Sequence, residues 1–563
     1  MSERAANRRI RLLLVFFALV FAGTLARAVW LQGVQASSLE RMALRQHRET
    51  IVIPAGRGTI FDRVGKPLAI GEQTTTVYAD PSRVEDARAV ALAAGKALGI
   101  DPEQLYPQLT DRTRAFVYVQ RKADSTKAAT LQKRGLAGLG FYPEELRAYP
   151  QRSVAAQVLG YAGVDNEGLE GLERALDAEL VGKPGRETIV KDPFGRAIDV
   201  ISSTVEERGA DVRLTLDNQI QAGAEAVLRA TVRRWNAEAA TAVVLDPKTG
   251  AVLAMAVAPR YDANRFPSAR VDRRRNRAVT DTYEPGSTFK LVTVAGALSE
   301  GLVAPSTTFT LRSSIQVADR VINEHAPRPT ERMSVAEILS QSSNVGTITL
   351  ARLLGKHRLY SWIDRFGFGR PTGLDFPGES RGIVLTPDLW SGSTIGNIPI
   401  GQGIAVTPVQ MAAAYAAIAN RGVWRAPYLV ERIGTENKRP RRERRVVTTA
   451  VAAQLMAMLR DVVSAEGGTG AAAAVPGYTV AGKTGTAAKP DSRGGYSDSR
   501  YVASFVGIVP ASSPRLVVLV AVDEPKGVIY GGVVAAPAFA EIARLGLQYL
   551  EIPPDQRLLA SAG

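Results

Sequence analysis

Hydrophobic and polar positions divide the chain into three parts with different patterns. Residues 12–26 form an uncharged apolar run close to the N-terminus. Short strand-like runs then alternate with Ala- and Leu-rich helical stretches up to a charged segment near residues 205–212. Beyond it the apolar runs are longer and keep helical or strand periodicity. We therefore predict an α+β, multidomain protein with parts at 1–35, 36–208 and 209–563.

The first part has the pattern of a membrane anchor. Four arginines precede the apolar run, and Arg27 and Trp30 follow its end. The run is shorter than the roughly 20 residues of a typical span, but arginine can reach the interface and tryptophan prefers it. Positive charge before the run predicts a single-pass signal anchor in the cell membrane, with a cytoplasmic N-terminus and an extracytoplasmic remainder. A cleaved signal peptide is the alternative, since Ala26-Arg27-Ala28 has Ala-x-Ala spacing.

The second part has the pattern of a mixed α+β domain. Polar residues 36–50 predict a helical stalk, and a glycine-rich segment lies at 160–173. This region contains no cluster of nucleophile, base and oxyanion donors, so we predict a non-catalytic pedestal. The pattern rests on strand-like runs at 75–79 and 115–120 and on helical stretches at 85–98 and 125–133.

The third part predicts helices packed on a mainly antiparallel sheet. Asp217 is placed to cap a helix, and residues 246–250 have the composition of a hairpin turn between two apolar strands. Residues 491–500 read as a polar loop and residues 536–550 as a closing helix. The predicted strands are 211–216, 241–245, 251–257, 478–487, 501–509 and 516–523.

Composition narrows the possible chemistry. The chain has no cysteine, which excludes thiol catalysis, cysteine-ligated metals and disulfides. Its three histidines are widely separated, which disfavours a Ser-His-Asp triad or a histidine-rich metal site. The net charge of +15 suits nucleic acid or an anionic envelope, but zinc spacings, a Walker loop and RNA-binding aromatic motifs are missing. We expect no nucleic-acid partner and read the basic run at 438–445 as a solvated loop, with an anionic-polymer contact as alternative.

Candidate chemistry begins at Ser287. Pro285 and Gly286 predict a turn into an apolar helix, with Lys290 one helical turn beyond Ser287. A serine hydroxyl needs a base to take its proton, and a desolvated lysine can serve as one. A helix N-terminus also favours an oxyanion. Ser-x-x-Lys alone is weak, since many exposed helices carry it by chance.

Two further motifs strengthen this interpretation. Ser342-x-Asn344 lies in a predicted turn between helices, after a capping box that begins at Ser334, and Lys483-Thr-Gly-Thr486 lies on a predicted strand. The set of Ser-x-x-Lys, Ser-x-Asn and Lys-Thr-Gly is typical of penicillin-binding proteins and serine β-lactamases. The chain resembles a class B penicillin-binding protein, a membrane-anchored peptidoglycan D,D-transpeptidase. Segments 57–65, 168–173, 401–410 and 501–507 also resemble this family, so the likeness covers almost the whole chain.

The resemblance implies a role for each motif residue in acyl transfer. Ser287 would attack the carbonyl of the penultimate D-Ala of a stem pentapeptide and release the terminal D-Ala. Lys290 would be its base, and Ser342 would relay the proton to the leaving amine. Lys483 would hold this network electrostatically, and Asn344 would bind the substrate amide or steady Lys290.

The same resemblance implies the substrate contacts. Thr484 and Thr486 would receive the terminal carboxylate, and the backbone N–H groups of Ser287 and Thr486 would form the oxyanion hole. Gly485 would let the substrate lie beside its strand as an added strand. The second substrate would be an amine of a neighbouring stem peptide, β-lactams would acylate the serine, and neither a metal nor an organic cofactor is expected.

Other classes share parts of this pattern. A serine β-lactamase is smaller, and the Glu-x-x-Leu-Asn segment of class A enzymes is missing here. A β-lactam sensor needs several membrane spans, a bifunctional class A protein needs a glycosyltransferase domain, and a non-catalytic scaffold would not need intact motifs. Segments 76–81 and 283–286 are more similar to the division-septum branch, penicillin-binding protein 3-like, than to the elongation branch. By resemblance the partners would be a SEDS-family glycosyltransferase and divisome proteins.

Overall fold

The computed structural model describes residues 3–35, 48–191, 197–438, 442–491 and 494–556. The chain divides into two compact units. One consists of Met1–Gly56 with Gly182–Gly209, and the other of Arg57–Val181 with Ala210–Gly563.

The first unit contains a long apolar helix and a small sheet. Helix α1 (Glu3–Val29) continues into a π-helical turn, η1 (Trp30–Val34). The stretch Asn7–Val34 is long and apolar enough to cross a membrane, with a mean hydropathy of 2.3, and its side chains are not buried by the chain. Antiparallel pairing joins β1 (Arg48–Ile53), β8 (Gly185–Lys191) and β9 (Ala197–Thr204). The helical stalk predicted over 36–50 falls mostly outside the described residues, and it is wrong for 48–50, which belong to β1.

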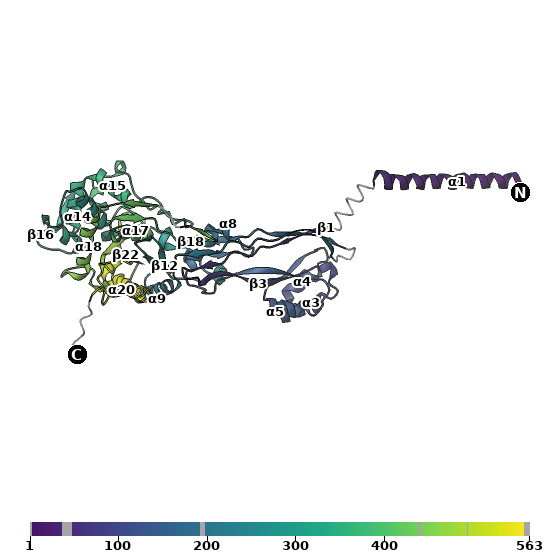
Figure 1. Cartoon of the computed structure of the whole chain (residues 1–563), viewed down its shortest axis with the longest axis horizontal. Helices are drawn as coiled ribbons and strands as arrows, with labels where there is room; N and C mark the ends of the chain where they lie inside the picture. The colour runs from purple at the N-terminus through teal and green to yellow at the C-terminus, as the bar shows by residue number, and fades with distance from the viewer. Residues whose placement is uncertain (1–2, 36–47, 192–196, 439–441, 492–493, 557–563) are drawn as a thin grey trace. The chain divides into compact units, whose positions relative to one another are not determined.

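The N-terminal half of the second unit is a mixed sheet with helices on it, as the sequence predicts. Asp86, Asp101 and Asp124 each cap a helix with their side chains. Figure 1 shows these helices beside β3. The helices are α3 (Ala87–Leu98), α4 (Pro102–Thr110) and α5 (Ser125–Gln132), and the strands are β2 (Ile60–Phe61), β3 (Pro67–Ala79), β4 (Val117–Ala123) and β5 (Leu139–Ala148).

This sheet also takes strands from much later in the chain. Strand β10 (Val212–Leu214) pairs in parallel with β2 and antiparallel with β18 (Val430–Ile433), which in turn pairs with β19 (Glu436–Asn437). Residues on both sides of position 209 therefore share one sheet within the second unit.

A cluster of buried ion pairs joins the start of the second unit to residues 147–177. The guanidinium of Arg57 lies 2.7 Å from the carboxylate of Glu173 and 2.7 Å from that of Asp177. Arg147 lies 2.7 Å from the second oxygen of Glu173. Arg57, Arg147 and Glu173 are buried, so Arg57 binds the segment that follows residue 160 to the start of this unit.

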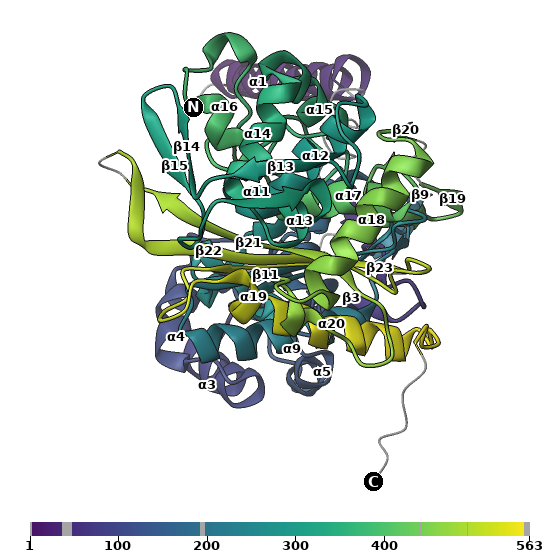
Figure 2. The same cartoon turned by 90° about the vertical axis from the view of Figure 1, so that its left-hand side faces the viewer.

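The C-terminal region is built on a five-stranded antiparallel sheet in the order β12-β11-β23-β22-β21. Figure 2 shows α9, α19 and α20 on one side and α12, α13, α17 and α18 on the other. Alternation along the strands separates two cores: Ala242 and Val520 face one, and Val243 and Leu519 face the other. The strands are β11 (Ala239–Leu245), β12 (Val252–Ala258), β21 (Ala481–Pro490), β22 (Tyr496–Val509) and β23 (Leu516–Asp523).

The helices around this sheet follow the predicted caps. Asp217 accepts hydrogen bonds from the first turn of α9, and Ser334 and Glu337 form the predicted capping box. The helices are α9 (Asn218–Trp235), α12 (Lys290–Ser299), α13 (Val335–Ser340), α14 (Asn344–Leu354), α15 (Lys356–Phe366), α17 (Pro408–Ala419), α18 (Thr449–Ser464), α19 (Gly531–Val534) and α20 (Ala536–Tyr549). Two small antiparallel strand pairs lie between α12 and α13 in sequence. They are β13 (Thr308–Leu311) with β16 (Glu331–Ser334) and the hairpin of β14 (Ser314–Val317) with β15 (Arg320–Asn323).

Two predictions about loops are wrong in part. Strand β22 begins at Tyr496, so half of the predicted loop 491–500 is strand. Within the basic run, β20 (Glu443–Arg445) pairs with β17 (Val423–Arg425), and the guanidinium of Arg444 lies 3.9 Å from the ring centre of Trp424. The charge of residues 443–445 predicted a loop, but pairing with a distant strand and stacking on Trp424 place them in a strand instead.

Candidate active site

The turn at Gly286 presents Ser287 at the start of a buried helix. Residues Gly286–Phe289 form a 3-10 turn, η4, that leads directly into α12 at Lys290. Gly286 has φ of +55°, a conformation that favours glycine, and a Cβ there would meet the backbone oxygen of Thr486 at 2.8 Å. Ser287 remains partly exposed, whereas Lys290 is fully buried. The turn predicted at 285–286 is therefore confirmed.

Lys290 joins the first motif to the second. Its Nζ donates to the carbonyl oxygen of Ser342 at 2.5 Å, to Oγ of Ser342 at 3.2 Å and to Oδ1 of Asn344 at 2.7 Å. Among the described residues it makes no hydrogen bond to the Ser287 hydroxyl. Burial lowers the pKa of Lys290 to about 7, although the negative charge of Glu324 opposes the shift. The amine can therefore exist in both protonation states near neutral pH.

Ser342 occupies the predicted turn between α13 and α14. Its φ is +64°, a left-handed conformation that is uncommon for a residue with a Cβ. Ser343 follows as the cap of α14, accepting a hydrogen bond from the N–H of Gly346 at 2.9 Å. The turn carries both the carbonyl and the hydroxyl of Ser342 to Lys290, which is the kind of strained placement often found at functional sites.

The third motif lies on β21, an edge strand of the five-stranded sheet. Lys483 is fully buried, and its Nζ lies 3.3 Å from Oγ1 of Thr484. Burial, together with the like charge of Lys290, lowers the pKa of Lys483 well below its ordinary value. Two lysines from distant segments therefore share one desolvated region.

The hydroxyls of this motif already have partners in the chain. Oγ1 of Thr484 lies 2.8 Å from Oγ1 of Thr469, and Oγ1 of Thr486 accepts from the N–H of Gly531 at 3.1 Å. These contacts fix both side chains against the segments that flank β21. The carboxylate-binding role expected for Thr484 and Thr486 stays a prediction.

Gly485 makes room for another segment of the chain beside β21. A Cβ at this position would meet Oγ of Ser504 at 2.3 Å and the backbone oxygen of Pro285 at 2.9 Å. The glycine thus lets the turn that carries Ser287 press against β21. The turn at Ser287 and the strand at Thr486 are therefore in contact. An oxyanion hole formed by the backbone N–H groups of these two residues would require this contact.

Sequence reasoning missed two groups at the edge of this site. Glu324 follows β15, and its carboxylate accepts hydrogen bonds from the backbone N–H groups of Asn344, at 2.8 Å, and Val345, at 3.2 Å. The ring of His325 makes an edge contact with that of Tyr530, their centres 5.0 Å apart. Neither group belongs to a motif or follows a hydrophobic period, so only the folded chain brings them to the site.

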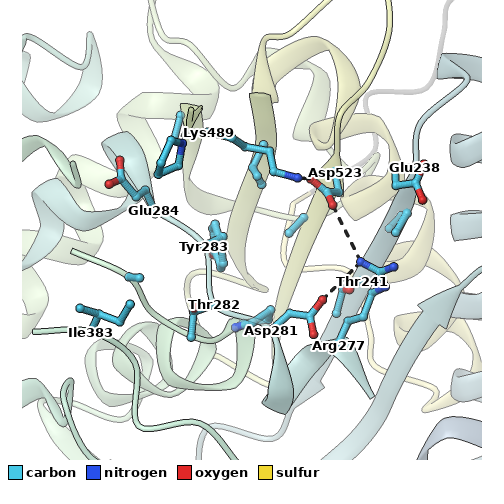
Figure 3. Close-up of a pocket in the computed structure, with 18 of the residues that line it drawn as sticks. Glu238, Thr241, Arg277, Asp281, Thr282, Tyr283, Glu284, Ile383, Lys489 and Asp523 are labelled. Atoms are coloured by element: carbon cyan, nitrogen blue, oxygen red, sulfur yellow. Dashed lines mark hydrogen bonds and ion pairs between the residues drawn. The ribbon is translucent and has the colours of Figure 1, made fainter. Parts of the chain in front are cut away.

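A cavity of about 760 Å³ lies beside the motif cluster. Figure 3 shows Arg277 between the carboxylates of Asp281 and Asp523, at 3.3 and 3.9 Å, and Lys489 bonded to Asp523 at 2.9 Å. None of the five residues expected to act catalytically lines it. Glu284 lines this cavity and lies three residues before Ser287.

The geometry of the three motifs indicates a class of enzyme. A partly exposed serine at a helix start, a buried lysine bonded to a Ser-x-Asn turn and a glycine-containing edge strand suit acyl transfer through a serine ester. Comparison with known proteins agrees with this class. The family description "Penicillin binding protein transpeptidase domain" matches residues 240–544, and "Penicillin-binding Protein dimerisation domain" matches residues 52–214.

Individual relatives cover nearly the whole chain. It is 33% identical to the peptidoglycan D,D-transpeptidase FtsI of Escherichia coli K12 over 97% of this chain and 92% of that protein. It is 34% identical to a probable peptidoglycan D,D-transpeptidase, PenA, of Neisseria meningitidis over 99% of this chain and 95% of that one. A crystal structure of penicillin-binding protein 3 from Mycobacterium tuberculosis with aztreonam has a TM-score of 0.71 and 32% identity, over 90% of this chain and 99% of that chain. The chain belongs to the class B penicillin-binding proteins, a family of serine D,D-transpeptidases, and the predicted two-domain fold is confirmed.

Proposed function

We propose that the chain crosslinks peptidoglycan stem peptides through an acyl-enzyme on Ser287. The observation that carries the proposal is the buried amine of Lys290, bonded to Ser342 and Asn344 one turn from the partly exposed Ser287. The chain is a D-Ala-D-Ala transpeptidase of cell-wall synthesis, and β-lactams acylate it as they do other penicillin-binding proteins.

In the first half-reaction, Oγ of Ser287 attacks the carbonyl carbon of the penultimate D-Ala, and neutral Lys290 takes the hydroxyl proton. The oxyanion is bound by the backbone N–H groups of Ser287 and Thr486. When the C–N bond breaks, the proton passes from Lys290 through the hydroxyl of Ser342, 3.2 Å away, to the nitrogen of the departing D-Ala. An ester on Ser287 remains, with Lys290 again neutral.

In the second half-reaction, the amine of a neighbouring stem peptide attacks the ester. Its proton returns by the same route, through Ser342 and Lys290 to Oγ of Ser287. The new amide is the crosslink, and the free serine is regenerated. A lysine whose pKa lies near 7 suits both directions, since proton transfer works best when the pKa of the catalyst is close to the working pH.

The edge strand β21 holds the donor peptide. The peptide lies along Lys483–Thr486 as an added strand, with its terminal carboxylate at Thr484 and Thr486. Lys483 adds positive potential beside the carboxylate when protonated and keeps the proton relay in place. Asn344 steadies Lys290 and donates to the backbone oxygen of Asn323 at 3.0 Å in the free protein.

This function is tested by measuring its two products, released D-Ala and crosslinked muropeptides. The full chain in detergent is incubated with glycan strands that carry pentapeptide stems, and released D-Ala and crosslinked muropeptides are measured. We expect both products from the unmodified chain and neither from Ser287→Ala. Ser464→Ala removes an exposed hydroxyl whose hydrogen bond goes to the backbone oxygen of Arg460 within α18, and it should leave both products unchanged. Equal crosslinking by Ser287→Ala would contradict the assignment.

We also propose a role in septal synthesis, anchored by α1. Segments 76–81 and 283–286, which resemble the division branch, support the role, and the elongation branch is the alternative. The expected partners are a SEDS-family glycosyltransferase and divisome proteins, bound by the anchor and the pedestal. A fluorescent fusion that gathers at mid-cell would support the division branch, whereas one dispersed along the side wall would favour elongation.

The proposed topology follows from the candidate span Asn7–Val34 and the arginines at its start. The N-terminus is cytoplasmic, and the remainder is extracytoplasmic. The functional division proposed is an anchor at 1–35, a pedestal at 36–208 and a transpeptidase region at 209–563. Protease added to intact spheroplasts should degrade the chain beyond the anchor and spare a tag at the N-terminus.

A further inference from the structure

Glu324 is a buried carboxylate at the edge of the site that no catalytic motif includes. It follows directly on β15, and its side chain is only 5% exposed. One carboxylate oxygen accepts from Oγ of Ser343 at 2.5 Å and from Arg328 at 2.8 Å. The other accepts from the backbone N–H of Asn344 at 2.8 Å. Most of its bonds therefore go to the start of α14, where the Ser-x-Asn motif lies.

The residue before it holds the other side of the same asparagine. The backbone oxygen of Asn323 accepts from Nδ2 of Asn344 at 3.0 Å. With Nδ2 held there, Oδ1 of Asn344 points to Nζ of Lys290, 2.7 Å away. Two consecutive residues of one loop thus fix both the backbone and the side-chain orientation of Asn344, and through it the position of Lys290.

The charge of Glu324 also acts on the site. Desolvation opposes ionisation of Glu324, but hydrogen bonds from Ser343, Arg328 and Asn344 outweigh it and lower the pKa of the carboxyl. The carboxylate is therefore negative at neutral pH. Its charge raises the pKa of Lys290 against the effect of burial.

The other charged and titratable groups of this region come from several elements. Lys483 lies on β21, His325 follows Glu324 in the chain, and Arg328 bridges Glu324 to Glu331 at 2.8 and 2.7 Å. Glu331 is 41% exposed, and its bond to Arg328 does not reach α14. Among the described residues, Glu324 is the carboxylate that both binds the Ser-x-Asn turn and places a negative charge near Lys290.

We propose that Glu324 is a positioning residue for acyl transfer: it holds the start of α14 so that Asn344 and Ser342 face Lys290, and it places a negative charge near the buried amine. The proposal rests on the function proposed for Ser287 and Lys290. Glu324 does not touch the reacting atoms. It sets where the base lies and at what pH the base becomes neutral.

The test is the rate of acylation of the full chain by a penicillin as a function of pH. If neutral Lys290 is the base, the rate of the unmodified chain rises with pH through the pKa of Lys290. Glu324→Gln removes the charge, so the pKa of Lys290 falls and the rise should begin about one pH unit lower. Because Gln cannot accept on both sides of its head group, the plateau rate should also fall, by about tenfold or more.

Two further variants separate charge from shape. Glu324→Asp keeps the charge on a shorter side chain, so the plateau should fall while the midpoint of the rise stays within a few tenths of a pH unit. Glu331→Gln removes the other carboxylate that binds Arg328 and should change neither quantity. Thermal unfolding of each variant checks that the chain is folded.

The proposal would be overturned by a Glu324→Gln protein whose plateau falls while its pH midpoint stays, because a purely structural role gives that result. It would also be overturned by an unchanged rate profile, or by a shifted midpoint in Glu324→Asp. If Glu324→Gln does not fold, Glu324→Asp decides the positioning claim: a plateau that stays unchanged or a midpoint that shifts would overturn it. Failure of the underlying function is distinguishable, since the unmodified chain would then show no acylation that depends on Ser287.

Discussion

Nζ of Lys290 lies 2.7 Å from Oδ1 of Asn344, although 54 positions separate the two residues in the chain. The bond links the first turn of α12 to the first residue of α14, and Lys290 is fully buried there. Burial lowers the pKa of this lysine to about 7. The Ser-x-Asn turn therefore positions the amine of Lys290 by accepting hydrogen bonds from it.

This relationship predicts the effect of Asn344→Asp. A carboxylate at hydrogen-bonding distance favours the charged amine, so the pKa of Lys290 should rise. The neutral, proton-accepting form then appears only at higher pH, and the acid side of the acylation profile should move upward by about one pH unit or more. The shift is opposite to that expected for Glu324→Gln. Acylation by a penicillin measured between pH 5 and pH 10 checks the direction, and a downward shift would contradict it.

Lys483→Ala should slow acylation strongly. The variant removes a buried amine beside Lys290. It also removes the positive potential that the proposed function places beside the substrate carboxylate. Loss of one preorganised electrostatic group typically costs about 100-fold or more in rate, and the apparent requirement for substrate should also rise. Lys489→Ala is a matched control on the same strand, since Lys489 pairs with Asp523 and Glu524 instead. A similar loss in both variants would point to damage of β21 as a whole.

Gly485→Ala should impair acylation without a new charge or a lost functional group. The added methyl would lie 2.3 Å from Oγ of Ser504 and 2.9 Å from the backbone oxygen of Pro285, so the turn that carries Ser287 must move. We expect a rate at least about tenfold lower, as small displacements at a reacting centre are costly. Gly223→Ala on α9 meets only the end of Leu545, at 3.3 Å, and should keep the full rate. Equal rates for both variants would refute the close-packing role of Gly485.

Arg57→Ala should destabilise the second unit. Without Arg57, the fully buried carboxylate of Glu173 keeps its ion pair with Arg147 but loses the one with Arg57. Asp177 loses its ion pair with Arg57 as well. Breaking a buried ion pair from one side typically costs about 3–5 kcal/mol. Arg83, paired with Asp80 at the surface and 67% exposed, gives the control, since such pairs contribute about 1 kcal/mol or less. Calorimetric unfolding of the two alanine variants should show a clearly lower transition temperature only for Arg57→Ala.

Local signals predicted the elements that depend on local chemistry. The cap at Asp217, the capping box at Ser334 and the hairpin turn at 246–250 are formed by side chains within a few residues of one another. The sheet order could not be predicted in this way. Pairing of β2 with β10, and of β10 with β18, joins residues separated by more than 150 positions and leaves no period in the sequence.

The same distinction holds at the site. Ser287, Ser342 and Lys483 belong to three short motifs, and the occurrence of all three in one chain indicated acyl transfer. Glu324 acts through bonds to a helix that begins 20 positions later, and the need for glycine at 485 comes from a turn 200 positions earlier. Such requirements arise from tertiary packing, so a single sequence does not display them.

Acylation of Ser287 is tested most directly by the intact mass of the full chain after incubation with a penicillin, beside the Ser287→Ala variant. We expect one stable adduct of the drug's mass on the unmodified chain, located at Ser287 by fragmentation, and none on the variant. A transient adduct with continued drug hydrolysis would indicate a β-lactamase instead. An adduct that persists on Ser287→Ala would contradict the central claim.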